Sequence, residues 1–262
     1  MKIDYIKIKK PFVRWLPGIK WNTNFHEIEL ELTTLCNLKC FNCDRSARQA
    51  PSNECMSLSQ IEKFVKESIH LKWNWRQITL LGGEPTLHPQ IFEIVEIIKC
   101  YKNFNPDCVV EMATNGHGDH VKKVLAILPN WISIRSTNKT SIVHDFCSYN
   151  VAPVDLDYYN EQDYSKGCWI TTACGLGLTR HGYYSCGAGA SVDRVFGFDL
   201  GIKKLKDVNS YALKKQKKII CSYCGHYKKN HNSKRIRQES MSPSWEKAYS
   251  DYQKKRPVLS EY

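Results

Sequence analysis

Polar and apolar residues alternate strictly from Glu27 to Thr34, which is the period of a strand whose two faces differ. Ser57-Leu58-Ser59-Gln60 then forms a capping box ahead of apolar residues at helical spacing, so a helix is expected there. The same alternation of strands and helices continues along the chain. The further predicted elements are a strand over 77–81, a helix over 89–101, a strand over 108–113, a helix around 119–128, a strand over 131–136, a short helix, and a strand near 151–154.

Strands that alternate with helices predict an α/β fold with a parallel sheet and right-handed crossovers. Five strands make the sheet a partial, shortened β/α barrel. Beyond Gly167 the rhythm stops, and residues 176–179 and 183–186 flank Arg180-His181-Gly182 in the pattern of a hairpin. The predicted divisions are an N-terminal extension (1–26), the partial barrel (27–160), a small C-terminal cysteine-rich lobe (161–230) and a basic, partly disordered tail (231–262).

The chain has 262 residues, 42% of them hydrophobic, which is enough for one full domain and an appendage. It contains no apolar run of membrane-spanning length, and its lysine-rich N-terminus lacks the apolar core of a signal peptide. We therefore expect a soluble, cytoplasmic protein without a membrane partner. Twelve cysteines in such a protein indicate metal ligation or catalysis, because thiols in the cytosol are kept reduced.

Positive charge is concentrated in one stretch. The net charge is +12, and residues 203–237 hold twelve Lys or Arg against one acid, Asp207. Such a block favours an anionic partner, although a solvated basic face is an equally valid interpretation.

Three cysteines, Cys36, Cys40 and Cys43, follow the first predicted strand at spacings of three and two residues. Three thiolates can hold three irons of a cubane cluster and leave the fourth iron open for a substrate or cofactor. A structural zinc site is the alternative, with Cys55 as its fourth ligand.

This loop resembles the signature loop of the radical S-adenosylmethionine (SAM) superfamily. Two further segments match the family pattern: Gly82-Gly83-Glu84-Pro85 resembles its GGEP segment, and Thr114-Asn115-Gly116 resembles its TNG turn. The resemblance implies a 4Fe-4S cluster on the three cysteines, SAM on the open iron, and contacts from the GGEP segment to the methionine amino group. It also implies a reductant such as flavodoxin or ferredoxin. The sequence departs from the family at Asn42, where an aromatic residue that packs on adenine is common; Phe41 stands one place earlier.

The alternation of polar and apolar residues also predicts which strand side chains face the catalytic side of the sheet. If Ile28, Leu30 and Leu32 pack against helices, the glutamates between them face the other way. On the fourth strand, Ser133 and Arg135 alternate with apolar residues in the same manner. Arg135 is a candidate for binding the SAM carboxylate or a substrate phosphate, and a salt bridge inside the barrel is the alternative.

A second set of cysteines lies in the predicted C-terminal lobe, and four thiolates can close a metal site completely. The arrangement resembles the Twitch domain of some radical SAM enzymes, which implies an auxiliary 4Fe-4S cluster. Gly182, ahead of the second ligand, fits that resemblance. Cys174 is the alternative to the first ligand, and a zinc knuckle is the alternative to the cluster. The predicted ligands are Cys168, Cys186, Cys221 and Cys224.

The remaining cysteines are expected to be small buried hydrophobic residues. Cys55 and Cys147 fall in predicted loops at or near the catalytic edge, so these two are the candidates for returning a hydrogen atom to a substrate radical.

The expected function is hydrogen abstraction from an anionic small molecule, sugar-like or phosphorylated, with the auxiliary cluster supporting oxidation or epimerisation. A ribosomal-peptide-modifying enzyme ranks second, because only about 26 residues precede the first strand, too few for a leader-binding domain. RNA ranks third, because the basic run lacks a recognised binding module. From a different class, a non-catalytic iron-sulfur or zinc scaffold that binds nucleic acid needs neither the GGEP nor the TNG segment.

Overall fold

The computed structural model describes residues 21–144, 146, 149–157, 163–227 and 239–262. Its strands are β1 (Glu27–Thr33), β2 (Gln77–Gly82), β3 (Val109–Thr114), β4 (Ile132–Ser136), β5 (Leu176–Thr179) and β6 (Gly182–Tyr184). Its α-helices are α2 (Leu58–His70), α3 (Ile91–Phe104), α4 (Asp119–Ala126), α5 (Trp169–Ala173), α6 (Gly187–Phe196), α7 (Ser210–Tyr223) and α8 (Pro243–Lys254). Short 3-10 turns, η2 (Pro85–Leu87) and η3 (Pro153–Asp155) among them, link these elements.

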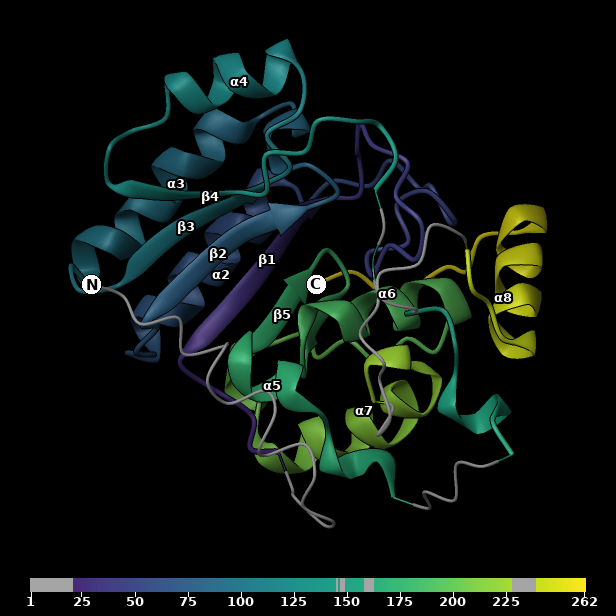
Figure 1. The fold of residues 1–262 in the computed structure, drawn as a ribbon. Coiled ribbons are helices and arrows are strands. Elements are labelled where there is room, and N and C mark those ends of the chain that lie inside the picture. The colour runs from purple at the N-terminus through teal and green to yellow at the C-terminus, as the bar shows by residue number, and fades with distance from the viewer. Residues whose placement is uncertain (1–20, 145, 147–148, 158–162, 228–238) are drawn as a thin grey trace.

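The six strands form one sheet in the order β4-β3-β2-β1-β5-β6 (Figure 1). All neighbouring strands are parallel except β5 and β6, which are antiparallel. The sheet is open at β4 and β6, so the α/β class and the partial barrel are confirmed. Because β1 lies between β2 and β5, the order of the strands along the chain reverses at β1.

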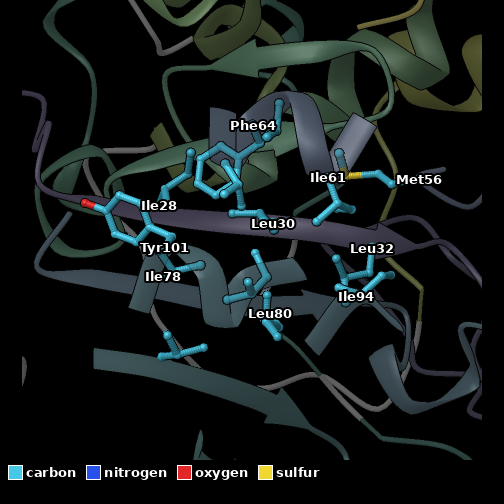
Figure 2. Packing of buried hydrophobic residues seen from close by; sticks show 14 of the residues in the cluster. Ile28, Leu30, Leu32, Met56, Ile61, Phe64, Ile78, Leu80, Ile94 and Tyr101 are labelled. Atoms are coloured by element: carbon cyan, nitrogen blue, oxygen red, sulfur yellow. The ribbon is translucent and has the colours of Figure 1, made fainter. Parts of the chain in front are cut away.

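The main core lies between one face of this sheet and α2 and α3. Ile28, Leu30 and Leu32 are buried there, and Figure 2 shows Phe64 of α2 and Ile94 of α3 packing in the same cluster. The alternation of β1 therefore places its apolar residues as predicted. The predicted capping box on α2 is also present, since the side chains of Ser57 and Gln60 bond to each other's backbone N–H.

The predicted strand near 151–154 is wrong. Residues Pro153–Asp155 form the 3-10 turn η3, and Pro153 at its start has no N–H to donate to a strand ladder. The short helix predicted before it is also absent from the described residues between 137 and 152. The fifth parallel strand is β5, the first strand of the predicted hairpin, which pairs with the free edge of β1. The sheet therefore continues past residue 160, where we predicted the barrel to end, and the division into domains stays a prediction.

The end of the chain is folded where we predicted a partly disordered tail. Trp245, Tyr249 and Tyr252 of α8 are buried against α6, because their spacing gives a polar helix one aromatic face. The tail residues before position 239 lie outside the described part of the chain. Within the described residues, none of the helices has the length and apolar character required to cross a membrane.

Candidate functional site

The three predicted SAM segments meet at the carboxyl ends of neighbouring parallel strands. The cluster loop (residues 35–44) follows β1, residues 82–85 follow β2, and residues 114–116 end β3. This edge is where parallel α/β sheets carry their sites, since the loops there are free to vary while the strands hold them in place.

Gly82 and Gly83 allow the end of β2 to lie directly against the start of the cluster loop. A Cβ on Gly82 would stand 2.2 Å from the Thr33 carbonyl oxygen, and one on Gly83 would stand 2.3 Å from that of Leu35. The N–H of Gly83 donates to the Thr33 carbonyl at 2.8 Å, and that of Glu84 to the Leu35 carbonyl at 2.7 Å. Any larger residue would push the loop away from β2.

Glu84 joins the ends of β2 and β3 from a fully buried position. One carboxylate oxygen accepts from the Asn115 N–H at 2.8 Å, and both accept from the Thr114 hydroxyl, at 2.8 and 2.9 Å. The Thr86 hydroxyl, in the turn that Pro85 begins, donates at 2.7 Å. The carboxylate is thus held by groups of the protein, and its predicted contact with a methionine amino group stays a prediction.

The turn after β3 also holds the cluster loop. The Asn115 side chain donates to Asn37 at 2.8 Å, and Asn37 donates to the His117 carbonyl at 2.7 Å. Asn37 directly follows Cys36, so its contacts fix where the loop leaves the sheet.

The first cysteine set (Cys36, Cys40 and Cys43) lies in this loop. Burial raises the pKa of Cys36, whose thiol also interacts with that of Cys40, and burial raises the pKa of Cys43 to about 12. The Lys139 ammonium lies 3.6 Å from the Cys40 sulfur and can offset the charge of a thiolate. Buried thiols whose thiolate forms are disfavoured are suited to a cationic metal centre, which stabilises those forms.

Asn42 has a positive φ of 52°, a conformation that asparagine tolerates far better than aromatic residues do. Its N–H donates to Glu239 at 2.8 Å, and its side-chain oxygen accepts from the Ser240 N–H at 2.9 Å. The polar residue at this position therefore fastens the cluster loop to the segment before α8. Phe41 instead lies under the Arg48 guanidinium, 4.5 Å from ring centre to charge.

Ser133 and Arg135 lie exposed on the edge strand β4. The Arg135 side chain donates to Glu111 of β3 at 2.7 Å, which is the salt bridge that we considered as the alternative. A role for either residue toward SAM or a substrate stays a prediction.

The second cysteine set (Cys168, Cys186, Cys221 and Cys224) gathers at three helix ends. Cys168 is the N-cap of α5 and Cys186 that of α6, while Cys221 and Cys224 lie in and just after the last turn of α7. The Gly189 N–H donates to the Cys186 sulfur at 3.3 Å. Helix N-termini stabilise negative charge, so the start of α6 partly offsets the effect of burial on a Cys186 thiolate.

The four thiols of this set also interact with one another. Burial raises the pKa of each, to about 11 for Cys168 and about 12 for Cys186, and the neighbouring thiols add to the effect at Cys186, Cys221 and Cys224. Cys174, the alternative ligand, has a raised pKa mainly because it is buried and next because its thiol lies against Glu29. This geometry favours Cys168 over Cys174 as the fourth ligand.

Among the residues that the structure describes, no three His, Cys, Asp or Glu side chains converge closely enough to hold one metal ion. Thiolates bind both iron-sulfur clusters and zinc, so the kind of metal centre at either set stays a prediction.

A close contact between Asp44 and His226 links the two cysteine sets. Asp44, which follows Cys43, lies 3.7 Å from His226, two residues after Cys224. Burial alone would raise the pKa of Asp44, but His226 and Arg45 lower it to about 2. Arg45 in turn donates to Glu29 on β1 at 2.7 Å. The two sets are therefore neighbours, joined through Asp44 and His226.

The structure describes one of the two cysteines that we predicted to return a hydrogen atom to a substrate radical. Cys55 pairs with Thr33 at the end of β1, its sulfur lies 3.2 Å from the Thr33 hydroxyl, and it lines a cavity at the catalytic edge. Cys147 lies outside the described residues. Sequence reasoning missed Glu54, His181 and Arg194, which line the same cavity. No motif connects these three residues, because they come from distant segments of the chain.

Comparison with known proteins covers the segments that meet at this edge of the sheet. Residues 30–134, which carry the first cysteine set and both supporting segments, match the model of the Radical SAM superfamily. This part of the chain, about two fifths of its length, is similar to the radical SAM domain.

The similar curated proteins include three described as probable GTP 3',8-cyclases. The one from Methanococcus maripaludis (strain C5) is 38% identical over 80 residues, 30% of this chain and 26% of the relative. The one from Methanococcus aeolicus is 34% identical over 95 residues (36% and 31%), and the one from Thermoplasma volcanium is 36% identical over 89 residues (34% and 25%). The matched segment therefore spans between a quarter and a third of these relatives' length.

Among solved structures, the chain is similar to BtrN in complex with AdoMet and 2-DOIA. The TM-score is 0.48 and the identity 12%, over 82% of this chain and 100% of BtrN.

Proposed function

We propose that this chain is a radical SAM enzyme that takes a hydrogen atom from an anionic small molecule, sugar-like or phosphorylated. A flavodoxin or ferredoxin would supply the electrons, and a second 4Fe-4S cluster would support oxidation or epimerisation. The observation that carries the proposal is the joining of three loops at one sheet edge: Glu84 bonds to Asn115, and Asn115 bonds to Asn37 beside Cys36.

The residues of the first cysteine set fit a cubane with one open iron. Cys36, Cys40 and Cys43 would hold such a cluster, which would supply the electron for reductive cleavage of SAM. The protein's part is to hold the loop rigidly. Gly82 and Gly83 keep β2 against it, Asn37 fixes its first turn, and Lys139 offsets thiolate charge at Cys40.

The second cysteine set supports a fully ligated auxiliary cluster. Its four thiols are close enough to interact, and the Asp44–His226 pair joins them to the first set. A cluster with no open iron is suited to exchanging electrons rather than binding SAM. Such a cluster would accept the electron that a substrate radical loses when it is oxidised.

The basic run supports an anionic partner. Lysines on and before α7, the helix that ends in the second cysteine set, are exposed at positions 204, 206, 214, 215 and 218. Like charges gathered on one helix attract anions over several ångströms, so they would concentrate a phosphorylated substrate or an acidic reductant near that set.

Formation of 5'-deoxyadenosine tests the first part of the proposal. Reconstituted protein is incubated with dithionite and SAM, and the product is measured by chromatography. The wild-type chain is expected to form it, and a Cys36→Ala, Cys40→Ala, Cys43→Ala variant to form none. Cys100→Ala, which removes an exposed thiol outside both sets, is the matched control and should match the wild type. A wild-type protein that binds iron but forms no 5'-deoxyadenosine would refute the enzyme and favour a scaffold.

Iron and sulfide content tests the auxiliary cluster. A Cys221→Ala, Cys224→Ala variant should fall from about eight irons per chain to about four. Cys100→Ala should keep about eight irons, which controls for loss of a thiol as such. Unchanged iron in the double variant would contradict the auxiliary cluster.

A further inference from the structure

A small cavity, partly open to solvent and with room for about one water-sized group, lies at the carboxyl ends of β1 and β5. Its walls come from the end of β1 (Glu31, Thr33), from Glu54 and Cys55, and from the turn between β5 and β6. These two strands are where the strand order reverses. In open parallel sheets such a point leaves a crevice between neighbouring strand ends, and ligands bind there.

Three charged or titratable side chains in this wall are more than nine-tenths buried and still have unpartnered atoms. They are Glu31 through one carboxylate oxygen, His181 through its ring nitrogens and Arg194 through Nε; within the described residues none of these atoms has a hydrogen-bond partner. The nearest ionic neighbours stand at 3.6 Å from His181 (Glu54) and 3.7 Å from Glu31 (Arg45). Buried polar groups are normally bonded, so this concentration in one cavity indicates a ligand.

Arg194 is held rigidly although its Nε is unpartnered. Its Nη1 donates to the Ala50 carbonyl at 2.7 Å and to the Tyr252 hydroxyl at 2.9 Å, and its Nη2 donates to the Arg45 carbonyl at 3.0 Å. The remaining N–H therefore has a fixed direction. A donor held in this way is preorganised for an acceptor atom on a bound molecule.

The pKa values of the two acids in the wall shift in opposite directions. Burial alone would raise the pKa of Glu54, but the neighbouring His181 and Arg194 lower it to about 2. Burial raises the pKa of Glu31, against the charges of Arg45 and Arg194. The cavity thus offers an N–H donor, Nε of Arg194, together with an acceptor, the unpartnered carboxyl oxygen of Glu31. A hydroxyl group on a ligand both donates and accepts, so one hydroxyl can satisfy either kind of partner.

We propose that this cavity takes a hydroxyl group of a sugar-like substrate, with Glu31, His181 and Arg194 as its hydrogen-bond partners. The inference rests on the proposed function and assigns the substrate class to particular residues. Cys55 lines the same cavity, so a hydroxyl group bound there would lie near this thiol.

Two variants with a matched control test this assignment. Glu31→Gln keeps the shape of the side chain but replaces one carboxyl oxygen with an NH₂ group, and His181→Phe keeps a ring but removes both nitrogens. Glu27→Gln is the control, because Glu27 lies on the same face of β1 at its other end, where it pairs with Arg76 outside the cavity. Reconstituted holoenzyme with SAM is titrated calorimetrically with myo-inositol, D-glucosamine and D-glucose 6-phosphate, and with trialanine as a peptide probe.

At least one of the hydroxylated probes should bind the wild type and Glu27→Gln equally, and should bind Glu31→Gln and His181→Phe about 10- to 100-fold more weakly. Probe binding that is unchanged in both cavity variants overturns the proposal. So does a wild-type holoenzyme that binds none of the hydroxylated probes, or one that binds only trialanine.

Uncoupled 5'-deoxyadenosine formation in the same preparations separates this inference from the proposed function. If the wild type cleaves SAM but the probe results fail, only the substrate assignment is lost. If the wild type does not cleave SAM, the proposed function fails instead. A cavity variant that unfolds is recognised by lost iron, and the other variant then decides the assignment.

Discussion

Replacing Glu84 with glutamine separates a structural role of this acid from a role in binding SAM. The carboxylate accepts from the Asn115 N–H and from the Thr114 and Thr86 hydroxyls in a fully buried position. Glutamine keeps one acceptor oxygen and turns the other into an NH₂ donor. Whichever way the amide is oriented, a donor of the protein then faces another donor.

The expected cost follows from these contacts. One charge-assisted hydrogen bond is lost, about 1.5–3 kcal/mol, and one buried donor is left unsatisfied, about 1–3 kcal/mol. Because the two terms overlap, we expect a loss of about 3 kcal/mol in the free energy of unfolding. For a chain of this length, Tm moves by ~2 °C per kcal/mol, which gives a decrease of about 6 °C.

The assay is thermal unfolding of reconstituted protein in the absence of SAM, followed by circular dichroism. Glu96→Gln, on the exposed side of α3, is the control and should keep the wild-type Tm. A Tm of Glu84→Gln within ~1 °C of the wild type, together with weakened SAM binding, would refute the reasoning, because Glu84 would then act on the ligand rather than on the protein.

Three further predictions concern other parts of the molecule. Gly82→Ala should abolish SAM cleavage while the chain still folds, because the new Cβ would meet the Thr33 carbonyl at 2.2 Å and displace the cluster loop; wild-type cleavage would contradict this. Trp245→Ala should lower stability by about 3–5 kcal/mol in urea unfolding, because the fully buried ring packs on Phe196 and Tyr149; a loss below ~1 kcal/mol would show that α8 is not firmly docked. Glu31→Gln should become more stable relative to the wild type as pH rises. Because the pKa of Glu31 is raised, the contribution of this group to wild-type stability is full below its ordinary pKa of 4.5 and declines as pH rises through the folded-state pKa. Urea unfolding across a pH series checks this, and a stability difference between variant and wild type that does not change with pH would contradict it.

The pattern of β1 shows how far local information reaches. Ile28, Leu30 and Leu32 are on the core face, because side chains of a strand alternate whatever else the chain does. The cysteine spacing and the glycines at positions 82 and 83 are equally local, and they indicated the site before any contact was known. The prediction of a strand near 151–154 was wrong because it rested on the apolar residues there, although Pro153 has no N–H to donate to a neighbouring strand.

Long-range pairing explains the remaining differences. Residues 176–179 have the pattern of a hairpin strand, and they pair with β6 in a hairpin. The same strand also extends the parallel sheet because it pairs with the free edge of β1, which the local pattern does not indicate. The aromatic face of α8 was hidden by its polar average composition, and its burial depends on α6 being there to receive it.

The sequence by itself determined the α/β class, the cluster loop and the two segments that support it, because these depend on periodicity and on residue types at short spacing. Only the tertiary structure decided that Glu84 is bonded within the protein, that the two cysteine sets are neighbours, and that Glu31, His181 and Arg194 share one cavity. Those relations join residues that are far apart along the chain, and they exist only once the strands have paired and the helices have packed on the sheet.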